Sequence, residues 1–149
     1  MRKRIVVTGL GTVSPLGNDV ETAWSNAAAG NSGIGKITKF DTEKFSTKIA
    51  GEVKGFDPLK YIEKKEIKKM DTFIHYAVAA VDEAMKDANL TITDDISCDT
   101  GVSIGVGIGG LPNIQEQSYK IKDRGPSKVT PFFIPMTISN MPSGTVSIR

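Results

Sequence analysis

The chain has 149 residues, of which 19 are basic and 17 acidic, and its formal net charge at pH 7 is +2. This length suits one domain, and 39% hydrophobic with 24% charged residues is typical of a globular protein. The small charge does not indicate nucleic-acid binding, and no stretch approaches the roughly 18 consecutive apolar residues of a membrane span. One cysteine and one histidine exclude an internal disulfide and a histidine-based metal cluster. We therefore expect a cytoplasmic protein that binds neither nucleic acid, membrane nor metal.

The N-terminal stretch predicts a strand followed by a helix. Residues 4–8 contain the continuous apolar run IVV, which is typical of a parallel strand covered on both faces. The run breaks at Gly9, after fewer residues than the ~7–15 of a signal peptide's apolar segment. Asn18 and Glu21 have the spacing of a capping box, and Gly30 closes the amphipathic pattern that follows.

The middle of the chain predicts loops and then helices. Residues 31–57 show no helical period, and we expect loops there with a small hairpin near residues 48–53. Residues 58–61 begin with proline, which suits the first turn of a short helix. Residues 71–88 carry one apolar stripe, which predicts a long amphipathic helix, and Asn89 can end it in a left-handed conformation.

Residues 101–110, GVSIGVGIGG, are the most β-branched and glycine-rich run of the chain. They predict a buried central strand that runs out into a glycine turn. A polar connection over residues 91–100 precedes this run, and a surface helix over residues 111–122 follows it. Residues 131–149 predict an aromatic loop and then helical or extended segments interrupted by prolines. The order of elements indicates an α/β fold with a largely parallel sheet.

Only two central strands are predicted, although each needs parallel neighbours on both sides. A pair of parallel strands with helices on them would leave apolar faces open. We therefore expect residues 1–149 to be an incomplete N-terminal domain of a larger protein, in preference to a complete chain whose open faces a partner covers.

The residues alone reveal no convincing catalytic group. VVTGLGTVSPLG resembles a dinucleotide-binding turn, but Ser14 replaces the third glycine and Pro15 interrupts the helix start, which favours a plain strand-to-loop crossing. Cys98 is surrounded by aspartates, which disfavour the thiolate. His75 lies near the start of the long helix, where a packed histidine is commoner than a catalytic base.

Four lysines in EKKEIKKM recur at i, i+1, i+4 and i+5, which gathers them on about one side of a helix. They are Lys64, Lys65, Lys68 and Lys69. Such a cluster is either an ordinary solvated face or a surface that attracts an acidic partner. Lys128 adds to it only where the fold brings it near. Further on, Phe132 and Phe133 are adjacent and cannot readily face the same way, so one can reach a second pocket or a subunit boundary.

Four stretches in this order resemble the N-terminal part of a β-ketoacyl-acyl-carrier-protein synthase of the elongating type. They are RIVVTGLGTVSPLGN, KKEIKKMDTFIHYAVAA, GVSIGVGIGG and GPSKVTPFFIPMTISNM, and the resemblance runs over the whole chain. The resemblance implies a thiolase-like fold, in which two α/β halves stack as layers αβαβα, and a homodimer. A thiolase or an initiating synthase is the weaker alternative, because the paired phenylalanines and the lysines match the elongating type.

The resemblance implies fatty-acid chain elongation by decarboxylative condensation. An acyl chain is loaded on a cysteine, a malonyl thioester on acyl carrier protein loses carbon dioxide, and the carbanion attacks the acyl thioester. The family needs no cofactor or metal. Its nucleophilic cysteine and two histidines lie beyond this chain, and neither Cys98 nor His75 matches them. We therefore expect no catalytic residue here.

Recognition residues do carry over from the family. Ile108 matches a residue that lines the acyl pocket, and Phe133, Ile134 and Thr137 match residues that reach the partner subunit's pocket across the dimer interface. Lys64, Lys65, Lys68, Lys69 and Lys128 match the basic surface that docks acyl carrier protein. Ser127 stands where some relatives have another basic residue. The alternative function is a non-catalytic module that binds carrier protein or another partner.

Overall fold

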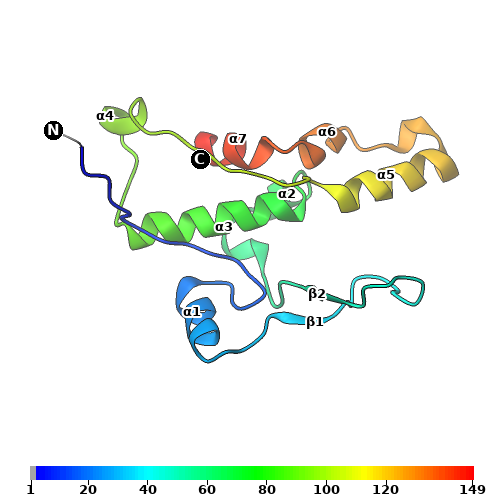
Figure 1. Cartoon of the computed structure of the whole chain (residues 1–149). Helices are drawn as coiled ribbons and strands as arrows, with labels where there is room; N and C mark the ends of the chain where they lie inside the picture. The colour runs from blue at the N-terminus through cyan, green and yellow to red at the C-terminus, as the bar shows by residue number, and fades with distance from the viewer. Residues whose placement is uncertain (1–2) are drawn as a thin grey trace. The chain divides into compact units, whose positions relative to one another are not determined.

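The computed structural model describes residues 3–149, which form two compact units. One contains the residues up to Asp57 together with Ala79–Leu90, and the other contains Pro58–Val78 and Thr91–Arg149. The long helix α3 contributes its first half to the second unit and its second half to the first (Figure 1).

Helices and turns dominate the described residues (Figure 1). In chain order the elements are α1 Val20–Ala28, β1 Ile34–Lys36, β2 Ile49–Gly51, the 3-10 helix η1 Pro58–Lys60, α2 Lys64–Ile67, α3 Thr72–Asp87, α4 Asp94–Ser97, α5 Leu111–Arg124, the 3-10 helix η2 Pro126–Lys128, α6 Phe133–Thr137 and α7 Met141–Ile148.

In the first unit, the glycine segment after residue 8 lies directly along the second half of α3. A Cβ atom on Gly11 would collide with the carbonyl oxygen of Ala80, and one on Gly9 would collide with that of Ala84. The Thr12 amide donates a hydrogen bond of 2.8 Å to the Glu83 carboxylate. Only glycine allows this backbone approach. The predicted tight strand-to-loop crossing is therefore replaced by a close crossing of a non-strand segment over a helix.

The N-cap of helix α1 lies one residue later than predicted. Asp19 is the N-cap, and its carboxylate accepts a 2.7 Å hydrogen bond from the Thr22 amide, which lowers the pKa of Asp19. The predicted pair of Asn18 and Glu21 is wrong, because the Asn18 side chain instead donates to the carbonyl of Lys54 at 2.8 Å. The predicted end is confirmed, since Gly30 has φ +70° directly after the helix.

A small hairpin forms as predicted, but its first strand lies outside the predicted range. Strands β1 and β2 pair antiparallel with Ile34 opposite Gly51, so only the second strand lies in the predicted range 48–53. The long connection is closed by the Glu52 carboxylate, which accepts from the Thr38 amide at 3.0 Å and from the Thr38 hydroxyl at 2.7 Å. A side chain thus brings together segments that no local turn signal connects.

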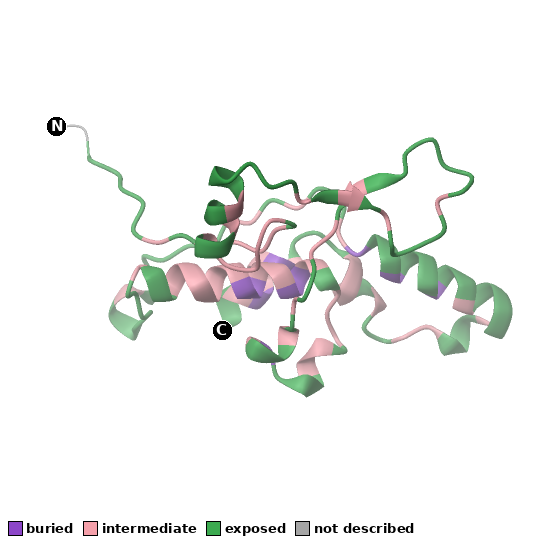
Figure 2. Ribbon diagram, turned by 90° about the horizontal axis from the view of Figure 1, so that it is seen from below, coloured by how far each residue is buried: buried purple, intermediate pink, exposed green. Residues whose placement is uncertain are grey.

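The second unit has a small apolar core built on the first half of α3. Ile62, Ile74 and Val78 are buried together, and Figure 2 shows buried residues concentrated on the long helix. The partly buried side chains packed against them are Tyr61, Ile67, Met70, Phe73, Met141 and Val146. The short helix after Pro58 and the long amphipathic helix are confirmed, and Asn89 has φ 48° after the latter.

The predicted parallel sheet is not formed by the described residues, whose one sheet is the two-stranded β1–β2 pair. Residues 4–8 and 101–106 have no strand pairing, and Ile5 is 94% exposed. The prediction of two buried central strands is wrong here for a physical reason. A strand exists only where neighbours take up its backbone hydrogen bonds, whereas a helix satisfies them within itself.

No helix among residues 3–149 is both long and apolar enough to cross a membrane.

The glycine crossing predicts a stability effect. Gly11→Ala should lower the free energy of unfolding by about 1–3 kcal/mol, because the added methyl group meets the backbone of α3. Denaturant unfolding of the 149-residue chain measures this change. Gly35→Ala is the matched control in the same unit, since its Cβ would meet nothing within 4 Å. Equal stability of both variants would contradict the close packing.

Candidate functional site

The lysine-rich segment folds as one helical turn followed by tight turns. Helix α2 ends at Ile67, Lys68 is its C-cap with φ −70° and ψ −11°, and the Lys69 amide donates to the carbonyl of Glu66 at 2.9 Å. The prediction that one helix carries all four lysines is therefore wrong, because the helix ends after the first two. Four residues are too few for a helix to propagate without tertiary support.

Glutamates neutralise two of these lysines. Lys65 pairs with Glu63 at 2.8 Å, and this hydrogen bond and the carboxylate charge raise the pKa of Lys65. Lys69 pairs with Glu66 at 2.7 Å. The first pair is exposed and the second is partly buried. Ion pairs near the surface contribute little stability, but they reduce the local positive potential. Lys64 and Lys68 are exposed, and no ion pair within the described part of the chain involves them.

One lysine also contacts the aromatic loop. The Lys69 ammonium lies 5.8 Å from the centre of the Phe132 ring, within the range of a cation–π interaction. Phe132 directly precedes α6, so the basic segment and α6 share this contact. Lys128 lies elsewhere, in η2 after the end of α5, and is exposed there.

The glycine turn at the end of residues 101–110 lies against the C-terminal end of α6. The Gly110 amide donates to the carbonyl of Thr137 at 3.2 Å. Gly109 has φ +94°, and a Cβ on it would collide with that same carbonyl oxygen. A Cβ on Gly110 would collide with the carbonyl oxygen of Met136 and lie 2.7 Å from an Asp71 carboxylate oxygen. Both positions therefore require glycine.

This approach brings the four predicted acyl-pocket residues into one region. Ile108 directly precedes the turn, and Phe133, Ile134 and Thr137 all lie on α6. Ile108 is 71% exposed and Ile134 is 56% exposed, whereas Phe133 and Thr137 are partly buried. The Thr137 hydroxyl donates to the carbonyl of Phe133 at 3.0 Å, within its own helix. The region thus presents mainly apolar side chains.

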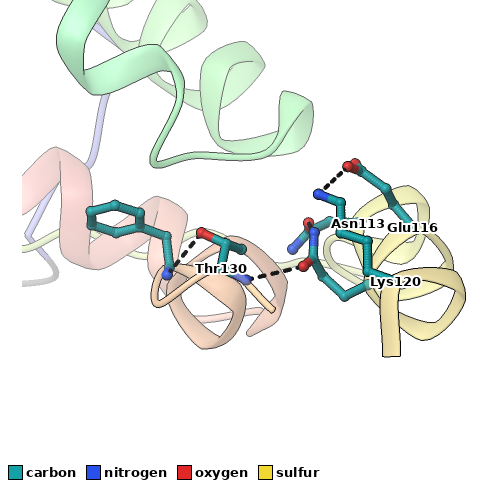
Figure 3. A network of polar contacts seen from close by, with 6 residues as sticks. Asn113, Glu116, Lys120 and Thr130 are labelled. Carbon is teal, nitrogen blue, oxygen red and sulfur yellow. Dashed lines mark hydrogen bonds and ion pairs between the residues drawn. The ribbon is translucent and has the colours of Figure 1, made fainter. Parts of the chain in front are cut away.

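A buried polar network anchors the other end of α6, and sequence reasoning missed it. Gln117 on α5 accepts a hydrogen bond of 3.1 Å from the Thr130 amide and donates one of 3.3 Å to Asn113 (Figure 3). The available signal was the spacing of Asn113 and Gln117, which are four residues apart and lie on one face of a helix. Their polarity, however, suggested a solvent-exposed face.

His75 and Cys98, the one histidine and the one cysteine, lie in different environments. His75 is only 7% exposed, and its Nε2 lies 3.3 Å from the carbonyl oxygen of Ile67, which confirms the packed histidine. Burial lowers the pKa of His75, opposed by this hydrogen bond and by the charge of Asp71. Cys98 is exposed at the end of α4. Residues 3–149 contain no group of three or more potential metal ligands.

Residues 2–149 match the family described as the β-ketoacyl synthase N-terminal domain, and the chain belongs to this family. Over 98% of its length it is 49% identical to 3-oxoacyl-[acyl-carrier-protein] synthase 2 of Staphylococcus aureus strain N315, and over 99% it is 48% identical to the protein of that name from Vibrio cholerae serotype O1. These matches cover 35% and 36% of the relatives, so the chain spans about a third of their length. The resemblance to elongating synthases is confirmed.

Solved ketosynthase structures have the same fold over 99% of the chain. A β-ketoacyl synthase from Burkholderia phymatum STM815 is 25% identical with a TM-score of 0.77, and 36% of it is covered. A chain of a solved complex, in which a type II polyketide synthase acyl-carrier protein is bound to its ketosynthase with the hexaketide, is 26% identical with a TM-score of 0.81, and 38% of it is covered. The chain therefore has the N-terminal portion of a ketosynthase fold, whereas the predicted largely parallel sheet is not formed by residues 3–149.

Burial of His75 predicts a loss of stability on mild acidification. The unfolded chain binds the imidazole proton more readily than the folded chain, so stability should fall as the pH drops below about 6.5. The thermal midpoint of the 149-residue chain, followed between about pH 7 and pH 5, measures this effect. His75→Gln should flatten that part of the profile, and an unchanged slope would contradict the assignment.

Proposed function

We propose that the chain is the N-terminal part of an elongating 3-oxoacyl-acyl-carrier-protein synthase, which acts in the cytoplasm as a homodimer. The enzyme would condense an acyl chain on its cysteine with malonyl-acyl carrier protein, with loss of carbon dioxide. The observation that carries this proposal is the 49% identity to a synthase 2 over 98% of the chain. These 149 residues would supply recognition surfaces, and the cysteine and two histidines of catalysis would lie outside them.

The first recognition surface is a wall of the acyl pocket. Ile108 and Ile134 expose branched apolar side chains on a backbone that is held by the Gly110–Thr137 hydrogen bond. Contact with an acyl chain is favourable by about 0.8 kcal/mol for each buried methylene group. Wall residues therefore limit chain length through the space that they leave. Ile108 would line the pocket of its own subunit, and Phe133, Ile134 and Thr137 would reach the partner subunit's pocket across the dimer interface.

The second recognition surface is a docking site for the acidic acyl carrier protein. Lys64 and Lys68 are exposed, while Lys65 and Lys69 carry glutamate partners that a carrier carboxylate or phosphate could replace. A ketosynthase of a type II polyketide synthase has been solved in complex with its acyl-carrier protein, which supports this type of partner. Lys128 would extend the surface. The alternative is a non-catalytic module that keeps the same docking residues.

Charge reversal tests the docking surface. In a full-length synthase that carries these residues, Lys64→Glu with Lys68→Glu should weaken carrier-protein binding about tenfold at low ionic strength, or about 1.4 kcal/mol. Titration calorimetry or surface binding at two salt concentrations measures the change. The double variant Lys65→Glu with Lys69→Glu should weaken binding as well.

The matched control is Lys36→Glu with Lys44→Glu, two exposed lysines of the other unit that carry the same charge change. A loss of affinity as large in the control as at α2 would show a general charge effect. Unchanged affinity of the α2 variant at low salt would exclude this segment as the docking site.

Enlarging a wall residue tests the pocket. Ile108→Phe should lower kcat/KM for the longest accepted acyl chains about tenfold and leave short chains little affected, because the larger ring occupies the end of the cavity. A series of acyl-carrier substrates measures the profile. Ile49→Phe is the matched control, an exposed isoleucine of the other unit.

The isolated 149-residue chain serves as the negative control of this assay. It should produce no condensation product, and turnover by it would contradict the absence of catalytic residues. A chain-length profile that Ile108→Phe leaves unaltered would remove this residue from the pocket wall.

A further inference from the structure

We propose that Gln117 is a positioning residue for chain-length selection, which acts by fixing where α6 begins and hence where Phe133 and Ile134 lie. The inference rests on the proposed acyl pocket and goes beyond it, because it assigns a role to a residue on a different helix. Gln117 is 2% exposed and is among the largest fully buried side chains of the described residues, on an otherwise largely exposed helix.

A buried glutamine amide is costly unless its polar atoms are hydrogen-bonded. Gln117 meets this condition through two specific partners. Its Nε2 donates to the Asn113 side-chain oxygen at 3.3 Å, which orients the amide, and its Oε1 then accepts from the Thr130 amide at 3.1 Å (Figure 3). The acceptor therefore faces the loop that leads to α6.

Thr130 connects Gln117 to the start of α6 through further hydrogen bonds. Its hydroxyl oxygen accepts from the Phe132 amide at 3.3 Å, and its carbonyl oxygen accepts from the Phe133 amide at 3.0 Å. Phe132 is the N-cap residue of α6 and makes no side-chain cap of its own. Thr130 thus takes up amide groups that the helix itself leaves free.

A helix as short as α6 depends on such anchors. It has five residues and includes Pro135, and isolated helices of this length are unstable in water. Gly110 holds its last turn through Thr137, while Gln117 holds its approach through Thr130. The two anchors are seven residues apart along the start of α5, or roughly 10 Å at 1.5 Å for each residue. Helix α5 therefore sets the position of both ends of α6.

The decisive experiment removes the anchor and leaves the pocket residues in place. In the full-length synthase, Gln117→Met keeps the length of the side chain and loses both hydrogen bonds. The ratio of kcat/KM for long and short acyl chains should change about tenfold, because Phe133 and Ile134 shift. Affinity for carrier protein should remain within about twofold, since Lys64 and Lys68 are untouched.

Gln115→Met is the matched control for this change. Gln115 lies on the same helix, is exposed and bonds only to the Tyr119 hydroxyl, at 3.1 Å, among the contacts described. Its chain-length ratio should equal that of the unmodified enzyme. A ratio shifted equally by both variants would overturn the proposal, because the effect would then belong to α5 in general.

A second pair of variants decides the question where Gln117→Met does not fold. Thr130→Val removes the hydroxyl that accepts from Phe132, whereas Thr130→Ser keeps it. A shifted ratio for valine and a normal ratio for serine would support the proposal, and equal ratios would overturn it.

Comparison with Ile108→Phe separates this inference from the proposed function. A ratio that responds to Ile108→Phe but not to Gln117→Met or Thr130→Val would overturn only the positioning role. A ratio that responds to none of them would overturn the pocket assignment and the inference with it.

Discussion

The close approach of the Gly109–Gly110 turn to the end of α6 is the constraint on which the proposed acyl-recognition region depends. Two carbonyl oxygens, those of Met136 and Thr137, occupy the space that a side chain on either glycine would need. The Gly110 amide uses the approach to donate a hydrogen bond to Thr137. A segment without side chains can therefore pack on a helix end through its backbone alone, and the apolar residues on both sides become neighbours.

The start of α6 is also held by a contact with α5, in this case through the Gln117 side chain. Gln117 reaches the loop before the helix, and Thr130 transmits the contact to the first amides of α6. A short helix between two fixed points has little freedom to slide or rotate. This arrangement would suit the proposed wall of an acyl pocket, because chain-length discrimination rests on differences of about one methylene group.

The net charge that residues 63–69 present depends on their glutamate–lysine ion pairs as well as on the number of lysines. Glu63 and Glu66 lie within the same short segment and bind Lys65 and Lys69. Lys64 and Lys68 make no ion pair with another described residue, so their charges are the ones that glutamate does not offset. In the proposed docking, a long-range field would steer the acidic partner toward this surface, and the paired lysines would exchange their glutamates for partner groups once contact is made.

The sequence by itself determined the features that depend on short-range interactions. Gly30, Pro58 and Asn89 mark helix ends correctly, because capping and backbone conformation are local properties. The four motifs also identified the family, since each is a sequence pattern in its own right. The residues proposed for the acyl pocket were named from that resemblance and not from their geometry.

Only the tertiary structure decided which distant segments meet. The partner of the second hairpin strand, the contact of Gly110 with Thr137 and the burial of Gln117 all join residues well separated along the chain. The two predicted central strands fail for the same reason, because a strand needs hydrogen-bonding neighbours that its own residues do not specify. Helices close their hydrogen bonds within four residues, and this difference in range explains why the longer helices α1, α3 and α5 were predicted well and the sheet was not.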